Sequence, residues 1–258
     1  MPLDDILISQ AIIDKYAKKL VSALNIDVAI AGAGPSGLAA AFYIAKKKKK
    51  VAIFERHLSI GGGMWGGGMM FNEIVVQEEG KKILDEFGVR TEKWKQGYYT
   101  ASSIETVCSL GNAAMKAGVE IFNLISVEDV MLQNKKVTGL VLNWSATQIA
   151  NLHVDPLTIR AKFVIEATGH PTEVLKCIEK KSGMKLQTPS GRIEGERPMW
   201  ADVGEKSLIK NTKEVFPGVW VTGMAANAAY GSPRMGPIFG GMLYSGKYCA
   251  EQILKRLK

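Results

Sequence analysis

The sequence predicts an α/β protein with a parallel sheet that binds a dinucleotide, and three observations carry this prediction. A G-x-G-x-x-G turn at 32–37 follows an apolar strand, a second apolar strand runs into an Ala-Thr-Gly turn at 167–169, and a third runs into Gly223. Helical segments separate these strands. Strands that end in glycine turns and alternate with helices are typical of Rossmann-like folds, whose ligands lie at the carboxyl edge of the sheet.

Composition favours one large domain over 1–258. The chain has 258 residues, of which 47% are hydrophobic, enough to bury a substantial core. No apolar run approaches the ~20 residues of a bilayer span, and the first residues lack the order of a signal peptide, so we expect a soluble, cytoplasmic protein without membrane contact. The cysteines, Cys108, Cys177 and Cys249, form no C-x-x-C pair, which argues against a disulfide framework or a thiolate zinc site.

The first expected element is an amphipathic helix over 6–24. Its apolar side chains recur close to a helical period. Such a helix either packs on the core or forms a contact within an oligomer.

The nucleotide fingerprint spans 27–56 and gives each glycine a separate task. Gly32 permits the tight turn, Gly34 lets the backbone approach a pyrophosphate, and Gly37 lets the next helix pack on the strand. Ser36 is then a phosphate neighbour, and Glu55, at the end of the second strand, is a ligand for the ribose hydroxyls. The alternative is an ordinary glycine-rich turn, which the small-residue helix and second strand that follow make much less favoured.

The net charge of +8 invites comparison with nucleic-acid-binding proteins. Much of it comes from a lysine run at 46–50 and from 255–258, which we interpret as solvated surface, and the first run suits the negative end of a helix dipole. No interleaving of aromatic and basic residues is present. Nucleic-acid binding is therefore a minor alternative.

A glycine-rich loop over 61–70 comes next, with six glycines in the eight positions 61–68. This composition predicts no regular element. A disordered linker is one interpretation, but Met64 and Trp65 are bulky anchors, and the loop follows the expected ribose-binding strand. We therefore favour a loop whose backbone closes over the dinucleotide.

The remaining elements complete the fold. Helices are expected at 81–87 and 103–117, and strands at 119–123, 126–130, 136–144, 162–169 and 217–224, before a closing helix at 240–257. The pattern resembles the two-dinucleotide-binding-domain flavoprotein (glutathione reductase) type, as a single domain with an inserted β-rich segment. In that type the late strand usually ends in Gly-Asp, whereas this chain has Gly223-Met224, so the acid that would bind FAD is missing.

Two histidines and one aspartate are candidate metal ligands. His153 and Asp155 stand at i and i+2 before Pro156, which favours an extended segment with both side chains on one side. His170 directly follows the 167–169 turn. An imidazole with a carboxylate suits Fe(II) or another divalent first-row metal. The alternative is that both histidines are polar loop residues bonded to backbone, and spacing alone slightly favours it.

Arg234 lies in a loop bounded by glycines and prolines. The planar guanidinium can grip a carboxylate through two parallel hydrogen bonds. A surface charge paired with an acid is the alternative, and the glycine-rich surroundings favour the carboxylate clamp.

Taken together, these motifs resemble the thiamine thiazole synthase family nearly end to end. Members of that family use NAD as a substrate, release nicotinamide, condense the ADP-ribose part with glycine, add sulfur and close an ADP-linked thiazole carboxylate. The matching pieces are 32–37, 54–56, 61–68, Asn143-Trp144, Asp155-Pro156, 167–170, Gly223-Met224 and 234–237.

One position separates two branches of the family. Eukaryotic-type members carry a cysteine where this chain has His153, and they sacrifice its sulfur in a single turnover. Histidine has no sulfur to donate. The chain therefore resembles the archaeal, sulfide-dependent branch, which uses free sulfide with Fe(II) over many turnovers.

The resemblance also implies roles for single residues. His153, Asp155, His170 and Arg234 would be catalytic, with Asp155 and His170 as iron ligands, contributed by neighbouring subunits of a homo-octamer, and Arg234 holding the glycine carboxylate. The positions matching NAD contacts are Ser36, Glu55, Arg56, Gly63, Val127, His153, Asp155 and Met224, beside Gly32, Gly34 and Gly37.

Other functions remain as alternatives at this stage. They are an FAD-dependent oxidoreductase of the same fold, a ribose 1,5-bisphosphate-type synthase, and a non-catalytic NAD-binding regulator. The last leaves the set of His153, Asp155, His170 and Arg234 unexplained.

Overall fold

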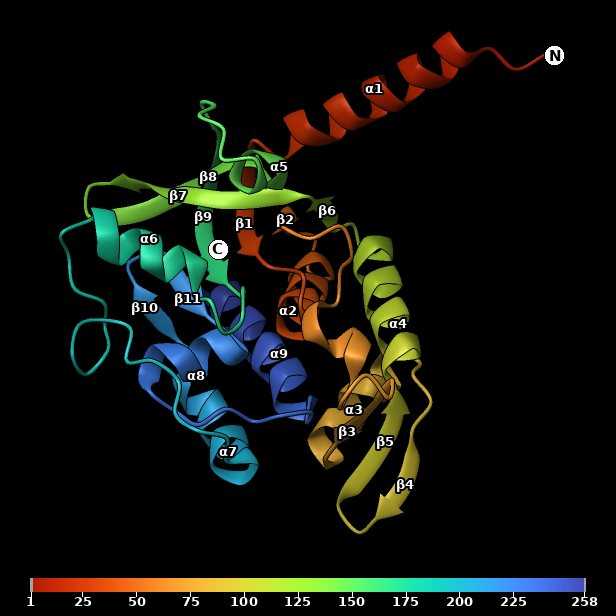
Figure 1. Cartoon of the computed structure of the whole chain (residues 1–258), viewed down its shortest axis with the longest axis vertical. Helices are drawn as coiled ribbons and strands as arrows, with labels where there is room; N and C mark the ends of the chain where they lie inside the picture. The colour runs from red at the N-terminus through yellow and green to blue at the C-terminus, as the bar shows by residue number, and fades with distance from the viewer. Residues whose placement is uncertain (1, 258) are drawn as a thin grey trace.

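A computed structural model describes residues 2–257, so Met1 and Lys258, the ends of the predicted 1–258 domain, lie outside the described residues. Its main sheet has eight strands in the order β10-β11-β9-β1-β2-β6, extended by β7 and β8 (Figure 1). The central pairs, β1–β2, β1–β9, β2–β6 and β9–β11, are all parallel, which confirms the predicted fold class. The bounds are β1 (Asn25–Ala31), β2 (Val51–Glu55), β6 (Glu120–Asn123), β9 (Leu157–Glu166), β10 (Glu214–Phe216) and β11 (Val219–Val221).

The antiparallel part of the structure has two pieces. β7 (Ile125–Gln133) and β8 (Lys136–Trp144), both predicted as strands, form an antiparallel hairpin, and β8 joins it to β9. A separate sheet of β3 (Glu73–Val76), β5 (Tyr98–Ser102) and β4 (Glu92–Lys95) was not predicted. Every residue of β4 is exposed, so this strand lacks the alternation of buried and exposed residues that marks a strand in a sequence.

Helices pack closely around the first turn. α2 (Pro35–Ala45) begins in the glycine turn and lies against α9 (Gly240–Arg256). A Cβ on Gly246 of α9 would lie 2.3 Å from the carbonyl oxygen of Ser36, so the two backbones meet directly. The other helices are α3 (Glu78–Glu86), α4 (Ser103–Lys116), α5 (Ser145–Ile149), α6 (Glu173–Lys181), α7 (Ala201–Asn211) and α8 (Met224–Tyr230).

The N-terminal helix, α1 (Asp5–Ser22), projects from the body of the protein (Figure 1). Asp4 caps it by accepting bonds from the N–H groups of Ile6 and Leu7. No residue of α1 is buried, and among its apolar side chains Tyr16 and Leu20 pack against the core. The helix therefore does not pack on the core along its length, and most of its apolar side chains are exposed.

The glycine-rich loop contains a regular element, contrary to the prediction. A 3₁₀ helix spans Gly62–Gly66, preceded by Gly61 at φ +97°. Met64 is fully buried, and the indole N–H of Trp65 donates to the carbonyl of Ile60. A Cβ on Gly61 would lie 2.6 Å from Val107, so glycine is required for this approach to α4. The two bulky anchors organise a turn that glycine content alone does not reveal.

Among residues 2–257, no helix combines the length and the apolar character that a membrane span requires.

Candidate active site

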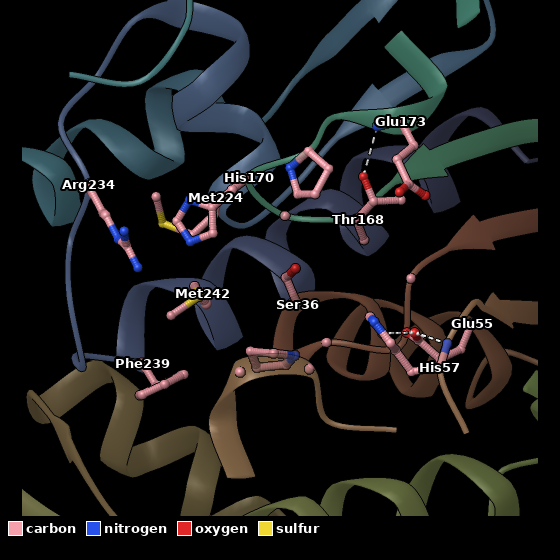
Figure 2. A pocket seen from close by; sticks show the side chains of 18 of the residues that line it. Ser36, Glu55, His57, Thr168, His170, Glu173, Met224, Arg234, Phe239 and Met242 are labelled. Atoms are coloured by element: carbon pink, nitrogen blue, oxygen red, sulfur yellow. Dashed lines mark hydrogen bonds and ion pairs between the residues drawn. The ribbon is translucent and has the colours of Figure 1, made fainter. Parts of the chain in front are cut away.

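A cavity of about 1330 Å³ lies where β1, β2, β9 and β11 end, at the carboxyl edge of the sheet (Figure 2). Small-molecule sites commonly occupy about 300–1,000 Å³, so this space suits an extended ligand. Most of the predicted site residues line it, namely Gly32, Gly34, Ser36, Glu55, Arg56, Gly63, Val127, His170, Met224 and Arg234.

The glycines of the first turn divide into two kinds. A Cβ on Gly32, where φ is +97°, would lie 2.5 Å from the carbonyl oxygen of Ala167, and one on Gly37 would lie 2.2 Å from that of Gly32. These two positions exclude a side chain because protein backbone occupies the space. Around Gly34, by contrast, no atom lies within 4 Å of the added Cβ. The space at Gly34 belongs to the cavity, as the fingerprint predicts for the glycine that a ligand approaches.

Glu55 is fixed at one end of the cavity. Its Oε2 accepts a hydrogen bond from the N–H of Ala33 at 2.8 Å, and its Oε1 accepts one from the backbone N–H of His57 at 2.8 Å. The His57 ring lies beside it, with Nδ1 2.9 Å from Oε1. The carboxylate is buried and retains lone pairs that can accept from hydroxyl groups. Next to it, Arg56 forms an ion pair with Glu173 at the start of α6.

Ser36 lies in the middle of the cavity, and methionines line the wall beyond it (Figure 2). A Cβ on Gly223 would lie 2.3 Å from the Ser36 hydroxyl oxygen, so the turn after β11 lies directly against α2. Met224 occupies the place of the flavoprotein acid and is buried. Its thioether offers an apolar surface where an acid would present charge.

Glu166, at the end of β9, holds the turn that carries His170. Its carboxylate accepts bonds from the N–H groups of Thr168 (2.8 Å), Val174 (2.7 Å) and Leu175 (3.3 Å). The last two belong to the first turn of α6, where free N–H groups favour an anion. Burial raises the pKa of Glu166, and these N–H groups act in the opposite direction.

Glu166→Gln is expected to lower the free energy of unfolding by about 1–3 kcal/mol, because the amide NH₂ would face an N–H donor that loses its acceptor in a buried site. Urea denaturation followed by circular dichroism measures this. Glu173→Gln is the control, since its ion pair with Arg56 is partly exposed and contributes about 0–1 kcal/mol. Equal stability of Glu166→Gln and wild type would contradict the assigned role.

His170 and Arg234 meet at the other end of the cavity (Figure 2). The His170 ring lies beside Met224, and the guanidinium of Arg234 extends into the same space. Two backbone bonds fix the segment of Arg234: its N–H donates to Arg197 (3.2 Å), and the N–H of Trp200 donates to its carbonyl (3.0 Å). Glu55 and His170 thus mark opposite ends of one elongated space, with the glycine turn between them.

His153 and Asp155 lie off the opposite edge of the sheet. Both precede β9, which runs parallel to β1 from Arg160 onward, whereas His170 follows its end. At about 3.3 Å per residue, the ten residues of β9 separate the two ends by about 30 Å. Both residues are exposed, and neither lines the cavity. A single chain therefore does not bring Asp155 and His170 together.

The metal-ligating side chains within one chain are correspondingly few. Across residues 2–257, no group of three or more His, Cys, Asp or Glu side chains could hold an ion. At the cavity, His170 and Glu196 are paired, with Nδ1 2.6 Å from the carboxylate. Within residues 2–257, Nε2 of this imidazole has no hydrogen-bond partner, so it is available as a ligand atom.

The three cysteines lie in α4, α6 and α9, and none lines the cavity. Burial raises the pKa of Cys177 to about 11 and raises that of Cys249 still further. A thiol needs to lose its proton to act as a nucleophile. These two are therefore poorly suited to supply sulfur to a ligand in the cavity.

Sequence reasoning did not find three acidic residues that organise the site. Glu173 pairs with Arg56, Glu196 pairs with His170, and Glu166 holds the turn between them. Glu166 precedes the 167–169 turn directly, which is a usable signal. Glu196 stands in a Gly-Glu-Arg-Pro segment whose constrained composition resembles that around Arg234, but its partner is 26 residues away.

Comparisons with known proteins agree with this arrangement. A model of the Thi4 family matches residues 9–239. A thiamine thiazole synthase of Methanothermobacter thermautotrophicus is 60% identical over 258 residues, covering 100% of both chains. Another, from Pyrococcus horikoshii, is 54% identical and covers 99% of both.

Solved structures extend the likeness to three dimensions. The crystal structure of Thermovibrio ammonificans THI4 matches with a TM-score of 0.96 and 53% identity, covering 100% of this chain and 99% of that one. A geranylgeranyl bacteriochlorophyll reductase-like protein from Thermoplasma acidophilum, 16% identical, matches with a TM-score of 0.57 over 90% of this chain and 79% of that one, a likeness of fold alone. The predicted family is confirmed, and the chain belongs to the Thi4 family.

Proposed function

We propose that this protein is a thiamine thiazole synthase that converts NAD, glycine and free sulfide into ADP-5-ethyl-4-methylthiazole-2-carboxylate with release of nicotinamide. The reaction would depend on Fe(II) and proceed over many turnovers. One observation carries the proposal: a single elongated cavity has an open glycine turn in its middle, a ribose-type carboxylate at one end, and an imidazole with a guanidinium at the other. Relatives named thiamine thiazole synthase, which match this chain over 99–100% of its length, support it.

The proposed substrate fits this layout in one direction. Glu55 would accept bonds from the adenosine ribose, and the N–H groups at the start of α2 would bind the pyrophosphate beside Gly34 and Ser36. The second ribose would then reach His170 and Arg234, where the chemistry takes place. Met224, in place of an acid, argues for a dinucleotide substrate and against a bound flavin cofactor. A yellow flavin spectrum of the purified protein would favour the oxidoreductase alternative.

Arg234 would hold the carboxylate of glycine. Its guanidinium extends into the cavity, and within residues 2–257 it forms no salt bridge. An arginine without an acidic partner is available for two parallel bonds to a carboxylate. Glycine bound in this way would present its amine toward the second ribose.

Fe(II) would be held by His170 together with Asp155 of a second copy of the chain. The donor chemistry fits, because imidazole and carboxylate are ligands for Fe(II) and two protein ligands leave positions for small molecules. When bound, the ion would supply Lewis acidity and a template for sulfide. His153, beside Asp155, would enter the same shared site.

A homo-oligomer, with the octamer implied by the family resemblance, would bring these two halves together. The edge that carries Asp155 is rich in exposed apolar side chains, which mark interaction surfaces. They include Ile6, Ile12, Ile13 and Val21 of the N-terminal helix and Ile149, Leu152 and Val154 near Asp155. Burial of this surface against another copy would stabilise the assembly.

Anaerobic incubation tests the proposed activity. Full-length protein with NAD, glycine, sulfide and Fe(II) is expected to form the ADP-linked thiazole over several turnovers, detected by liquid chromatography and mass spectrometry. Omission of sulfide should stop product formation, since His153 has no sulfur to donate. Product limited to one equivalent per chain, or no thiazole under reducing, iron-replete conditions, would contradict the proposal, and a phosphorylated ribose product would favour the bisphosphate synthase alternative.

Arg234→Lys is expected to raise the KM for glycine about 10- to 100-fold, because losing a charge-assisted bond of about 1.5–3 kcal/mol has that effect on binding. The KM for NAD should stay close to the wild-type value. Steady-state kinetics with each substrate varied in turn measures both. Arg90→Lys is the matched control, since Arg90 pairs with Glu105 away from the cavity. An unchanged KM for glycine in Arg234→Lys would contradict the proposed binding of the glycine carboxylate by Arg234.

A further inference from the structure

We propose that Glu196 is a positioning residue for His170, which it holds in the tautomer and orientation that present Nε2 to the cavity as a ligand. This inference rests on the proposed function in one respect, the role of His170 in holding a metal. It adds a residue that would act through the histidine and would not itself be a metal ligand.

The contact itself is close and symmetric. Nδ1 of His170 lies 2.6 Å from one carboxylate oxygen of Glu196 and 2.7 Å from the other. An ionised carboxylate only accepts hydrogen bonds, so the proton between them belongs to Nδ1. A neutral imidazole with its proton on Nδ1 carries its lone pair on Nε2. Histidines that bind metals commonly donate their other N–H to such a partner, which fixes the ring and raises its basicity.

Glu196 is itself held by backbone on both sides. The N–H of Gly195 donates to the carbonyl of Ala228 at 3.0 Å, and the N–H of Arg197 donates to that of Ser232 at 3.3 Å. The segment is therefore anchored to the end of α8 and to the stretch that leads to Arg234. The N–H of Arg234 donates to the carbonyl of Arg197 in the same segment. These backbone hydrogen bonds therefore position both the guanidinium and the carboxylate that orients the imidazole.

Glu196 is the more buried of the two side chains. The Glu196 side chain is 21% exposed and that of His170 is 45% exposed, and both line the cavity. The neighbouring Glu194 is different: its carboxylate accepts from the N–H of Ser190 within its own loop and does not line the cavity. Glu194 therefore supplies a matched control of the same residue type in the same segment.

Titration with Fe(II) alone, in the absence of oxygen and on the assembled full-length protein, tests the inference. Glu196→Ala is expected to weaken Fe(II) binding about 10- to 100-fold, the range for loss of such an outer partner. Glu196→Gln should fall between Glu196→Ala and wild type, because its amide oxygen can accept the same bond. Glu194→Ala should bind Fe(II) as wild type does, and NAD affinity should be unchanged in every variant.

A second measurement keeps the inference testable if Glu196→Ala folds poorly. Nitrogen NMR of ¹⁵N-histidine-labelled wild-type protein without metal reports which ring nitrogen of neutral His170 carries the proton, with His170→Ala identifying its signals. We expect the proton on Nδ1.

Each contrary result has a distinct meaning. A proton on Nε2, or wild-type Fe(II) affinity in Glu196→Ala, would overturn the positioning role. An equal loss in Glu196→Gln and Glu196→Ala would also overturn it and make Glu196 a direct ligand. Wild-type Fe(II) affinity in His170→Ala would instead remove His170 from the metal site, which is a failure of the proposed function.

Discussion

Co-expression of the His170→Ala and Asp155→Ala variants is expected to restore thiazole formation that neither variant has alone. Each variant lacks one half of the proposed metal site, and β9 separates these halves by about 30 Å within a chain. In a mixed oligomer, a chain with intact His170 can meet a chain with intact Asp155. With equal expression and random assembly, about a quarter of the sites would be complete, because each site draws its two ligands from different copies.

Differently tagged variants allow mixed oligomers to be purified by two affinity steps before activity and bound iron are measured. The matched control combines His170→Ala with Arg234→Ala. These residues share one cavity in one chain, so no mixed oligomer of that pair contains a complete site. Activity near zero in proven mixed oligomers of the first pair would show that Asp155 does not complete the site across chains.

Gly34→Ala is expected to weaken dinucleotide binding about 100-fold and leave the fold intact. The backbone at Gly34 has φ −70° and ψ 179°, which alanine adopts readily, and no protein atom lies within 4 Å of the new Cβ. The methyl group would instead meet the pyrophosphate. Loss of about 3 kcal/mol of charge-assisted bonding corresponds to an affinity about 100-fold weaker, while stability should be unchanged or raised by about 0.4–1 kcal/mol.

Gly37→Ala provides the opposite case. Its Cβ would lie 2.2 Å from the carbonyl oxygen of Gly32, which is backbone and cannot rotate away. We expect this variant to lose about 3 kcal/mol or more of unfolding free energy through overpacking. Isothermal titration with NAD and thermal unfolding of both variants give the two readouts, and NAD affinity near wild type in Gly34→Ala would contradict a pyrophosphate at this turn.

Features that depend on neighbouring residues were predictable from the sequence. The turn around Gly32, the strand ending at Glu55 and the turn before His170 each follow from residues within one short segment. The family match, carried by the same motifs, is confirmed over 9–239. Local patterns suffice here because the glycine turn, its strand and its helix are consecutive in the chain.

Features that depend on distant residues were not predictable. The predicted strand at 162–169 began five residues later than β9, and the register of β9 on β1 shows that Asp155 and His170 lie at opposite edges of the sheet. The pairing of His170 with Glu196 depends on a backbone hydrogen bond from Gly195 to Ala228 in α8. The sheet formed by β3, β4 and β5 also escaped prediction, because β3 has only four residues and every residue of β4 is exposed.

Because of the length of β9, dilution of the protein would affect the nucleotide site and the proposed iron site differently. The residues described here as lining the cavity belong to one chain, so its occupancy by the proposed NAD would depend mainly on NAD concentration. The proposed ion site is split between chains, so by mass action its occupancy also depends on protein concentration. A diluted, dissociated sample would thus keep its nucleotide and release its iron, and a newly synthesised chain would acquire the two in that order.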